Sequence, residues 1–417
     1  MSEPEIQDGS DTPPPHPRGH GHRSTFLWMG ALSVITLLLG VLRELVIARD
    51  LRASGSADLF FRGLVIVNAS RNFGLALYRA RWIPLGSGPS ALSLVRRELP
   101  TTGLLVVASL VGLGAVLGPG VWSSALTWVF AVAVTLAVLG SAVRALAERG
   151  GYERRGFVLE WALPLGTIAG ALWVGHGALG PALGISSGLL VGLLALVPVV
   201  FLTQAARGHA LLGPDHSGHT RWLLLDTMLY VNLGLLDASL SLYIFDEGGL
   251  ALLNYAYLFV NAALAVPTAA ATVVALRLAA DPARARAILR RWAPLAGLLV
   301  GGAVLLVWAL LGWVPVATRI DAAAGWSITA AIAPLVLASV PFAALRLANT
   351  VGRQARVAAD PKGLWPWDLV GLALRTVVLV VGASWYGVLA SPVALVVGEL
   401  VQLGAWWAWR PATPRSR

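Results

Sequence analysis

The sequence predicts an all-α membrane protein that crosses the bilayer many times, and three observations carry that prediction. First, 57% of the 417 residues are hydrophobic and only 12% are charged, whereas about 25% is usual in soluble domains. Second, apolar runs of about 20 residues, the length that spans a bilayer, recur along the whole chain. Third, positive charges collect in alternate segments between these runs. Together they exclude a soluble domain with a single membrane anchor.

Residues 1–24 are expected to form a disordered cytoplasmic tail. They are rich in Pro, Gly, His and charge, so they cannot bury enough apolar surface to fold. The apolar run that begins near Thr25 is too long for the core of a secretion signal and is not followed by a small-residue cleavage site. We therefore expect it to stay in the protein as the first membrane helix. The His residues of the tail have no other ligands beside them and the chain has no Cys, so no metal site is expected.

Six helices are expected in the first half, each bounded by charges, Gly or Pro. They are predicted at about 25–48, 57–79, 101–120, 124–147, 156–175 and 180–203. The second is the least apolar, because it ends in RNFGLALYRARW, and it could be broken. GPGVWSSA separates the third helix from the fourth, the basic stretch RGGYERRG separates the fourth from the fifth, and GHGALG precedes the sixth.

Six more helices are expected in the second half, after a cytoplasmic linker at 208–221. They are predicted at about 222–244, 249–276, 293–314, 326–351, 366–386 and 389–409. FDEGGL lies between the seventh and eighth, and an arginine-rich segment at 277–291 precedes the ninth. A loop around Arg319, a basic segment at 353–362 and a turn near Ser391 separate the remaining helices. Residues 411–417 are expected to form a C-terminal tail.

Lys and Arg occupy alternate segments between these helices. One set is heavily basic, whereas the opposite set has almost no positive charge apart from Arg49, Arg52 and Arg319. Because positive loops remain on the cytoplasmic side, both termini should be cytoplasmic and the number of helices should be even. The same distribution accounts for the net charge of +10, so we expect no nucleic-acid partner.

Two internal similarities indicate that the chain is built from repeated halves. ADLFFRGLVIVNA from Ala57 resembles AYLFVNAALAVPTA from Ala256, and AVRALAERGGYERRG from Ala142 resembles AALRLANTVGRQARV from Ala343. Both offsets are about 200 residues. Six helices per repeat keep the two halves in the same orientation, so we predict an N-lobe at 25–207 and a C-lobe at 222–410, related by an axis along the membrane normal.

Ionisable side chains within the first two predicted helices are the candidate binding residues. Each costs on the order of 3 kcal/mol at the bilayer centre and therefore needs a partner or water. The ionisable candidates are Arg43 and Glu44 in the first helix and Asp58 and Arg71 in the second, and the polar Asn68 joins them; Arg62 lies one turn after Asp58. Arranged along one side of a cavity, the arginines would suit phosphate oxygens. The alternative is that Arg43 and Glu44 snorkel to the interface and that Asp58 and Arg62 form an ordinary pair.

Asp237 is the candidate for ion coupling, because it lies deep in the seventh predicted helix. A lone carboxylate there is either a site for Na⁺ or H⁺ coupling or a protonated acid bonded to a neighbouring helix, and the sequence leaves both open. Arg375 is expected to pair with Asp368 or with a neighbouring helix, and Glu160 and Glu399 are expected at the membrane interface. The sequence has no Walker A, HExxH or GxSxG motif, so neither an enzyme nor another cofactor is expected.

The stretch GVLRELVIARDLRASGSADLFFRGLVIVNASRNF resembles the opening signature of the lipid II flippase family (MurJ, or MviN) within the MATE-like multidrug/oligosaccharidyl-lipid/polysaccharide exporter superfamily. The matching positions are Gly40, Arg43, Glu44, Ala48, Arg49, Gly55, Asp58, Phe60, Phe61, Asn68 and Arg71. Looser similarity extends over most of residues 25–390. The chain departs from the family at Leu37, where an arginine is usual nearby, and at Tyr257 and Leu258, which replace an Asp-Arg pair. It also has twelve predicted helices, whereas family members that flip lipid II commonly have fourteen.

The resemblance implies two six-helix lobes around a cationic cavity that opens alternately to each face of the bacterial cytoplasmic membrane. The cargo would be a saccharide linked to polyprenyl pyrophosphate, such as lipid II or an exopolysaccharide precursor. Arg43 and Arg71 would hold the pyrophosphate, and Glu44 and Asp58 would orient them. Membrane lipid surrounds such a protein, which is expected to be a monomer, with glycan-synthesis enzymes as possible partners. The alternatives are a cation-coupled multidrug exporter, in which Asp237 would matter more, and a non-transporting scaffold, which Leu258 favours.

Overall fold

The computed structural model describes residues 20–82, 91–118, 121–149, 153–175, 177–204, 234–278, 282–359 and 365–408. The regular structure within these ranges is helical, which confirms the predicted all-α class. The α-helices are α1 (His20–Leu51), α2 (Gly55–Trp82), α3 (Ala91–Leu117), α4 (Ala125–Arg149), α5 (Glu153–Trp173), α6 (Leu179–Gln204), α8 (Gly234–Ile244), α9 (Gly249–Leu278), α10 (Pro282–Gly312), α11 (Val314–Ala324), α12 (Ile328–Ala338), α13 (Val340–Ala359), α14 (Trp365–Tyr386) and α15 (Ala390–Ala408).

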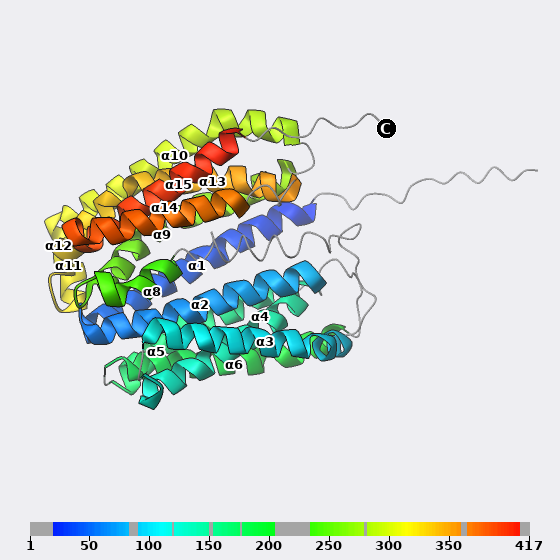
Figure 1. The fold of residues 1–417 in the computed structure, drawn as a ribbon. Coiled ribbons are helices and arrows are strands. Elements are labelled where there is room, and N and C mark those ends of the chain that lie inside the picture. The colour runs from blue at the N-terminus through cyan, green and yellow to red at the C-terminus, as the bar shows by residue number, and fades with distance from the viewer. Residues whose placement is uncertain are drawn as a thin grey trace, which may run out of the picture.

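The helices form two bundles (Figure 1). Helices α2 to α6 make up the first bundle, and α9 to α15 make up the second. Helix α1 lies between them, because it packs against α5 of the first bundle and against α9 and α11 of the second. Helix α8 also joins the bundles through contacts with α2, α3 and α14. The predicted lobe boundaries near 207 and 222 fall outside the described residues and stay a prediction.

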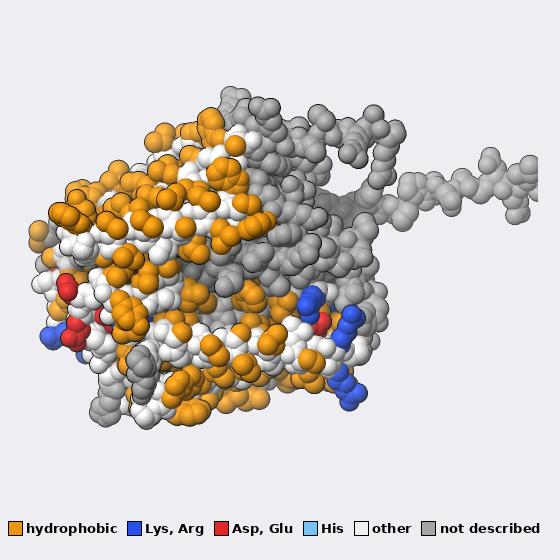
Figure 2. All heavy atoms as spheres, in the orientation of Figure 1, with side chains coloured by type: hydrophobic (Ala, Val, Ile, Leu, Met, Phe, Trp, Pro, Cys, Tyr) orange, Lys and Arg blue, Asp and Glu red, His pale blue; other side chains and the backbone are white. Residues whose placement is uncertain are grey.

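The surface of the described helices is that of a membrane protein. Apolar side chains cover the middle of the face in Figure 2, and charged side chains gather near its two ends. Leu104 and Leu298 are 70% and 74% exposed, as expected for side chains that face lipid. Among the described residues, five helical segments are long and apolar enough to cross a membrane, or six if the bent pair α11–α12 counts as one. This measure does not confirm the predicted number of twelve.

The structure differs from the prediction around Arg319. The expected loop is the helix α11, which meets α12 at a bend of 115°. Gly325 allows the bend because its φ of +73° is in the left-handed region, where glycine has no steric penalty. The carboxylate of Asp321 then accepts bonds from the backbone N–H and the hydroxyl of Thr329, at 2.9 and 3.0 Å. These bonds satisfy the first turn of α12.

Other segments follow the prediction, differ from it or lie outside the described residues. Helices α3 and α10 begin at Ala91 and Pro282, about ten residues before the predicted starts at 101 and 293, and the predicted helix at 326–351 is divided between α12 and α13. Helix α2 is continuous, although its moderate hydrophobicity left a break possible. Residues 20–24, predicted as tail, form the start of α1. The linker at 208–221, the first part of the seventh predicted helix and the C-terminal tail are outside the described residues.

Helices α5 and α6 are in backbone contact along a line of glycines. A Cβ atom added to Gly184 of α6 would lie 2.0 Å from the carbonyl oxygen of Gly166 in α5. One added to Gly170 would lie 2.2 Å from the carbonyl oxygen of Gly180. Small residues permit such an approach in a membrane, where van der Waals packing holds helices together. The contact fixes the position of α5, which carries part of the cavity wall described below.

Candidate functional site

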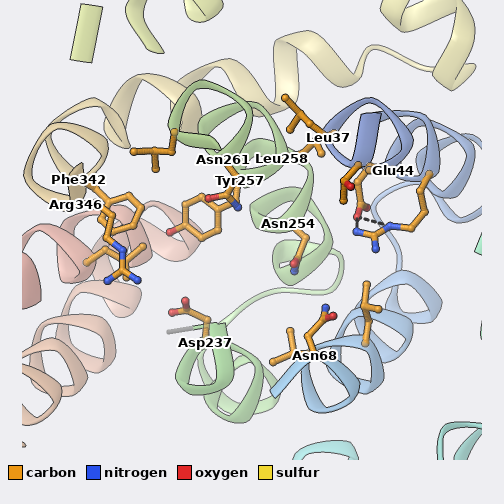
Figure 3. A pocket seen from close by; sticks show the side chains of 17 residues that line it. Leu37, Glu44, Asn68, Asp237, Asn254, Tyr257, Leu258, Asn261, Phe342 and Arg346 are labelled. Atoms are coloured by element: carbon orange, nitrogen blue, oxygen red, sulfur yellow. Dashed lines mark hydrogen bonds and ion pairs between the residues drawn. The ribbon is translucent and has the colours of Figure 1, made fainter. Parts of the chain in front are cut away.

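Two adjoining cavities of about 560 and 550 Å³ lie between the bundles. Side chains from both bundles line the first cavity, which is shown in Figure 3. The shared lining comes from α1, α2 and α9 and consists of Thr36, Gly40, Arg43, Val65, Asn68 and Asn261. The first cavity adds residues of α13 and α15, and the second adds residues of α5. Polar groups thus occupy a hollow inside a largely apolar protein.

Asp58 of α2 closes the space between the bundles at one end. Its two carboxylate oxygens accept bonds from the backbone N–H groups of Gly248 and Ala251, both at 2.8 Å. Asp58 therefore caps the N-terminus of α9, where N–H groups lack partners within the helix. In the same contact, the N–H of Gly55 donates to Glu247 at 2.9 Å. Asp58 and Glu247 thus hold the α1–α2 corner against the second bundle.

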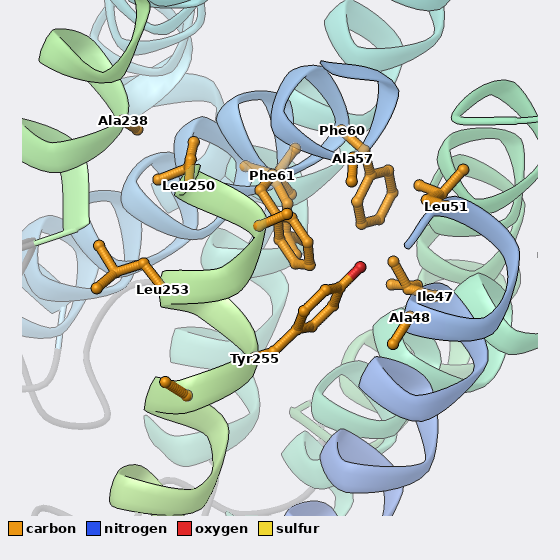
Figure 4. Packing of buried hydrophobic residues seen from close by; sticks show 14 of the residues in the cluster. Ile47, Ala48, Leu51, Ala57, Phe60, Phe61, Ala238, Leu250, Leu253 and Tyr255 are labelled. Atoms are coloured by element: carbon orange, nitrogen blue, oxygen red, sulfur yellow. The ribbon is translucent and has the colours of Figure 1, made fainter. Parts of the chain in front are cut away.

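An apolar core reinforces this closed end (Figure 4). Phe61 of α2 packs edge-on against Tyr255 of α9, with ring centroids 5.3 Å apart. The Tyr255 hydroxyl donates to the carbonyl oxygen of Arg52 at 2.9 Å, and the Trp326 indole donates to that of Ala48 at the same distance. These contacts involve the end of α1 and the start of α2. The cavity lies beyond them, among earlier residues of α1 and later residues of α2.

Replacing Asp58 by Ala should loosen the closed end. A lost cap costs about 1 to 2 kcal/mol, so we expect roughly tenfold more frequent opening. The chain has no Cys, so a single Cys in place of the buried Ala48 reports opening through its rate of maleimide labelling. The exposed Asp50 provides the control, since Asp50→Ala should leave the rate unchanged. Equal labelling in the Asp58→Ala and parent proteins would contradict the capping role.

Each arginine on the cavity wall is paired with a carboxylate. Arg43 forms an ion pair with the adjacent Glu44, and its Nε lies 3.0 Å from the Glu44 Oε1. Arg71 Nη1 lies 3.0 Å from Glu160 Oε2. In the second bundle, Arg346 Nη1 of α13 lies 2.9 Å from the Oε1 of Glu399, a residue of α15. The resemblance implies a cationic cavity, and each of these arginines has a carboxylate partner that offsets its charge.

The structure brings together four of the predicted binding residues. Arg43, Glu44 and Asn68 line the first cavity, and Asn68 lines the second together with Arg71. Asp58 is not part of either lining, because it bonds α9 at the closed end. The predicted alternative of an Asp58–Arg62 pair does not describe the contact either, since the Arg62 Nε donates to Ser241 of α8 at 2.9 Å.

Asp237, the predicted coupling residue, already has a cationic partner. The Arg375 Nη2 donates to one carboxylate oxygen at 2.7 Å, and the Ser391 hydroxyl donates to the other at 3.0 Å. Asp237 and Arg375 are each 2% exposed. Arg375 therefore pairs with a neighbouring helix, one of the two expectations, whereas Asp368 accepts a bond from Gln402 at 2.6 Å. A coupling cation would have to compete with a tethered guanidinium.

The sequence did not single out Arg346 as a cavity residue and placed Glu160 at the interface. Arg346 fell near the end of the predicted helix at 326–351, just before the basic segment at 353–362. A signal for it was present in the internal repeat, because the segment containing Arg346 resembles the one containing Arg144. In both bundles the arginine pairs with a glutamate of another helix, Glu160 for Arg144 and Glu399 for Arg346.

The two helical bundles, closed at one end around a polar cavity, are similar to solved structures of transporters. The chain superposes on the lipid II flippase MurJ in an inward closed conformation with a TM-score of 0.67 and 15% identity, over 92% of this chain and 88% of that one. For a MATE transporter in the straight conformation, the TM-score is 0.60 and the identity 13%, over 93% and 94% of the two chains.

A third similar structure is the MATE transporter VcmN of Vibrio cholerae in the bent form, with a TM-score of 0.57 and 15% identity over 92% of this chain and 94% of that one. No family model and no curated protein matches the sequence. The predicted fold class is confirmed, and the chain has the multi-pass membrane fold shared by MurJ and MATE transporters. Identities this low establish the fold alone.

Proposed function

We propose that the protein is a transporter that moves a polyprenyl-pyrophosphate-linked saccharide across the bacterial cytoplasmic membrane by alternating access. The observation that carries the proposal is the presence of Arg43 and Arg71 on the wall of a cavity between two bundles. Guanidinium groups bind phosphate oxygens through paired hydrogen bonds. Placing them within the membrane is costly, and a phosphorylated head group is a ligand that makes use of them.

The closed end gives the proposed cycle a direction. The positive-inside rule supports a cytoplasmic position for the start of α1 and the end of α2. The Asp58 contacts would then close the opposite side, and the cavity would face the cytoplasm. The head group would enter between the bundles while the polyprenyl chain stays in lipid. Breaking the bonds from Gly248 and Ala251 to Asp58 would then open the far side.

Polar side chains near the arginines suit the saccharide. Asn68, Asn254 and Asn261 line the cavity and offer amides that both donate and accept hydrogen bonds. Glu44 orients Arg43 through their ion pair. The carboxylate that a cation-coupled exporter would use, Asp237, also lines the first cavity, but it is paired with Arg375.

Reconstitution in liposomes tests the proposal. Arg43→Ala and Arg71→Ala should each slow the flipping of a fluorescent undecaprenyl-pyrophosphate-linked saccharide by about 10- to 100-fold, because a charge-assisted bond contributes about 1.5 to 3 kcal/mol. The matched control is Arg319→Ala, which removes an exposed arginine of α11 and should leave the rate unchanged. Flipping at the parent rate by correctly inserted Arg43→Ala and Arg71→Ala proteins would overturn the proposal.

A further inference from the structure

Arg71 belongs to a chain of five charged side chains that connects α2, α4 and α5. Glu160 accepts a bond from Arg71 at 3.0 Å through one carboxylate oxygen and a bond from Arg144 through the other. Arg144 also donates to Glu148 at 3.1 Å, and Arg79 donates to Glu148 twice, at 2.6 and 2.5 Å. Three guanidiniums against two carboxylates leave one positive charge in excess.

Glu160 is the member of this chain that both bridges two guanidiniums and lines a cavity. It lines the second cavity together with Arg71, and their side chains are 19% and 23% exposed. Two oxygens held between guanidiniums from two helices reproduce the way in which arginines bind a phosphate group. The Glu160 carboxylate therefore occupies the position at Arg71 that a ligand phosphate would take.

We propose that Glu160 is an internal competitor of the ligand, which holds Arg71 in the empty cavity and is displaced from it by a phosphate group. The inference rests on the proposed function. It names Glu160 as the residue that limits the affinity of the transporter for its phosphorylated ligand. Phosphate binding must break the Arg71–Glu160 bond, so Glu160 lowers the affinity of the cavity for the phosphate. The same competition helps the phosphate to leave after the bundles have changed orientation.

The neighbouring contacts allow a phosphate group to replace Glu160 at Arg71 without leaving a buried charge unpaired. When Glu160 leaves Arg71 it retains its bond to Arg144, which in turn retains Glu148. An uncompensated buried charge, the usual penalty for breaking such a pair, is therefore avoided. The backbone is also held, because the Ser141 hydroxyl donates to the carbonyl oxygen of Arg71 at 2.8 Å. The movement can thus be confined to side chains.

The contacts of the other cavity pairs differ from this arrangement in the described residues. Arg43 and Glu44 are adjacent in the chain and form a single pair. Glu399 is 2% exposed, and its second carboxylate oxygen accepts a bond from Asn349 at 2.6 Å. Among the cavity ion pairs of the described residues, the group around Glu160 contains more guanidiniums than carboxylates, and it could therefore take up an added anion.

Binding of farnesyl diphosphate to the purified full-length protein tests the inference. Glu160→Gln should lower its Kd by about tenfold, because the charge-assisted bond that the ligand must replace is weakened. Farnesol, which lacks phosphate, should bind the variant and the parent equally. Inorganic pyrophosphate is measured as well, because it carries the diphosphate group without a lipid chain. A gain for both phosphate compounds assigns the site to the ionic group alone, and a gain for farnesyl diphosphate only assigns it to a lipid head group; either supports the role of Glu160.

Three further variants complete the test. Glu98→Gln removes a carboxylate that pairs with Arg81 at 2.6 Å outside the cavity lining, and it should leave the Kd unchanged. Glu160→Asp keeps the charge on a shorter side chain and should give a smaller decrease, which provides a result if Glu160→Gln does not fold. Adding Arg71→Ala to Glu160→Gln should abolish the gain.

An unchanged or higher Kd in the folded Glu160 variants would overturn the inference. If Arg43→Ala and Arg71→Ala still slow flipping in that case, the proposed function stands without it. If those arginine variants flip at the parent rate, the proposed function fails, and the competition of Glu160 for a diphosphate is decided by the binding measurements alone.

Discussion

Replacing Arg375 by Leu is expected to destabilise the protein by about 3 to 5 kcal/mol, because it leaves the buried carboxylate of Asp237 without a counter-charge. Arg375 of α14 and Asp237 of α8 are each 2% exposed and are joined at 2.7 Å. Unfolding of the detergent-solubilised protein by heat or denaturant measures the loss. The pair also joins two helices far apart in the sequence, so α8 should lose its packing against α14.

Two further variants separate the loss of a partner from the net contribution of the pair. The double variant Asp237→Leu with Arg375→Leu should recover most of the stability, since buried ion pairs often contribute little relative to apolar replacements. Within the described residues, the Nε and Nη1 of Arg375 have no hydrogen-bond partner, which favours that recovery. Arg81→Leu, at a pair whose arginine is 40% exposed, should cost about 1 kcal/mol or less. A single Arg375→Leu variant as stable as the parent would contradict this account.

Gly184→Val is the second substitution with a large expected effect. Even a Cβ at this position would lie 2.0 Å from the Gly166 carbonyl oxygen, and neither backbone can yield without separating α5 from α6. We expect a loss of about 3 kcal/mol or more, at the upper end of overpacking effects, measured as thermal unfolding in detergent. Transport should fall as well, because α5 carries Glu160 into the cavity wall.

The control for Gly184 is Gly103 of α3, whose added Cβ would meet nothing within 4 Å. Gly103→Ala should be neutral or stabilising by up to about 1 kcal/mol, because alanine favours the helix. Comparable losses in Gly184→Ala and Gly103→Ala would show that helix propensity, and not the α5–α6 contact, sets the stability.

The sequence predicted most helices because an apolar run of membrane length is a local property. The predicted ranges 124–147 and 389–409 correspond to Ala125–Arg149 and Ala390–Ala408 in the structure. The α11–α12 bend was missed because it depends on tertiary contacts. Trp326 beside the bend bonds to Ala48 of α1, and Asp321 caps the next helix, and neither contact has a periodic signal.

The sequence predicted those site residues whose charge is costly inside a membrane. It did not predict contacts between residues that are far apart in sequence. Arg43 and Arg71 stood out because they interrupt membrane-length runs, and both line the cavity. The role of Asp58 could not be deduced, since its partner Gly248 is 190 residues away in sequence. Glu160 was predicted at the membrane interface, because one sequence does not show which helices pack around a given residue.

The paired arginines of the cavity wall also bear on energetics across the membrane. Moving one elementary charge through a potential of 100 mV involves about 2.3 kcal/mol. Since Arg43 and Arg346 each carry their own neutralising carboxylate, these two pairs would transfer little net charge when an unloaded protein reorients, and the potential would act on the one surplus positive charge of the group around Glu160. A bound diphosphate would add its own negative charge to that group, so the electrical driving force on the loaded step would differ from that on the unloaded step.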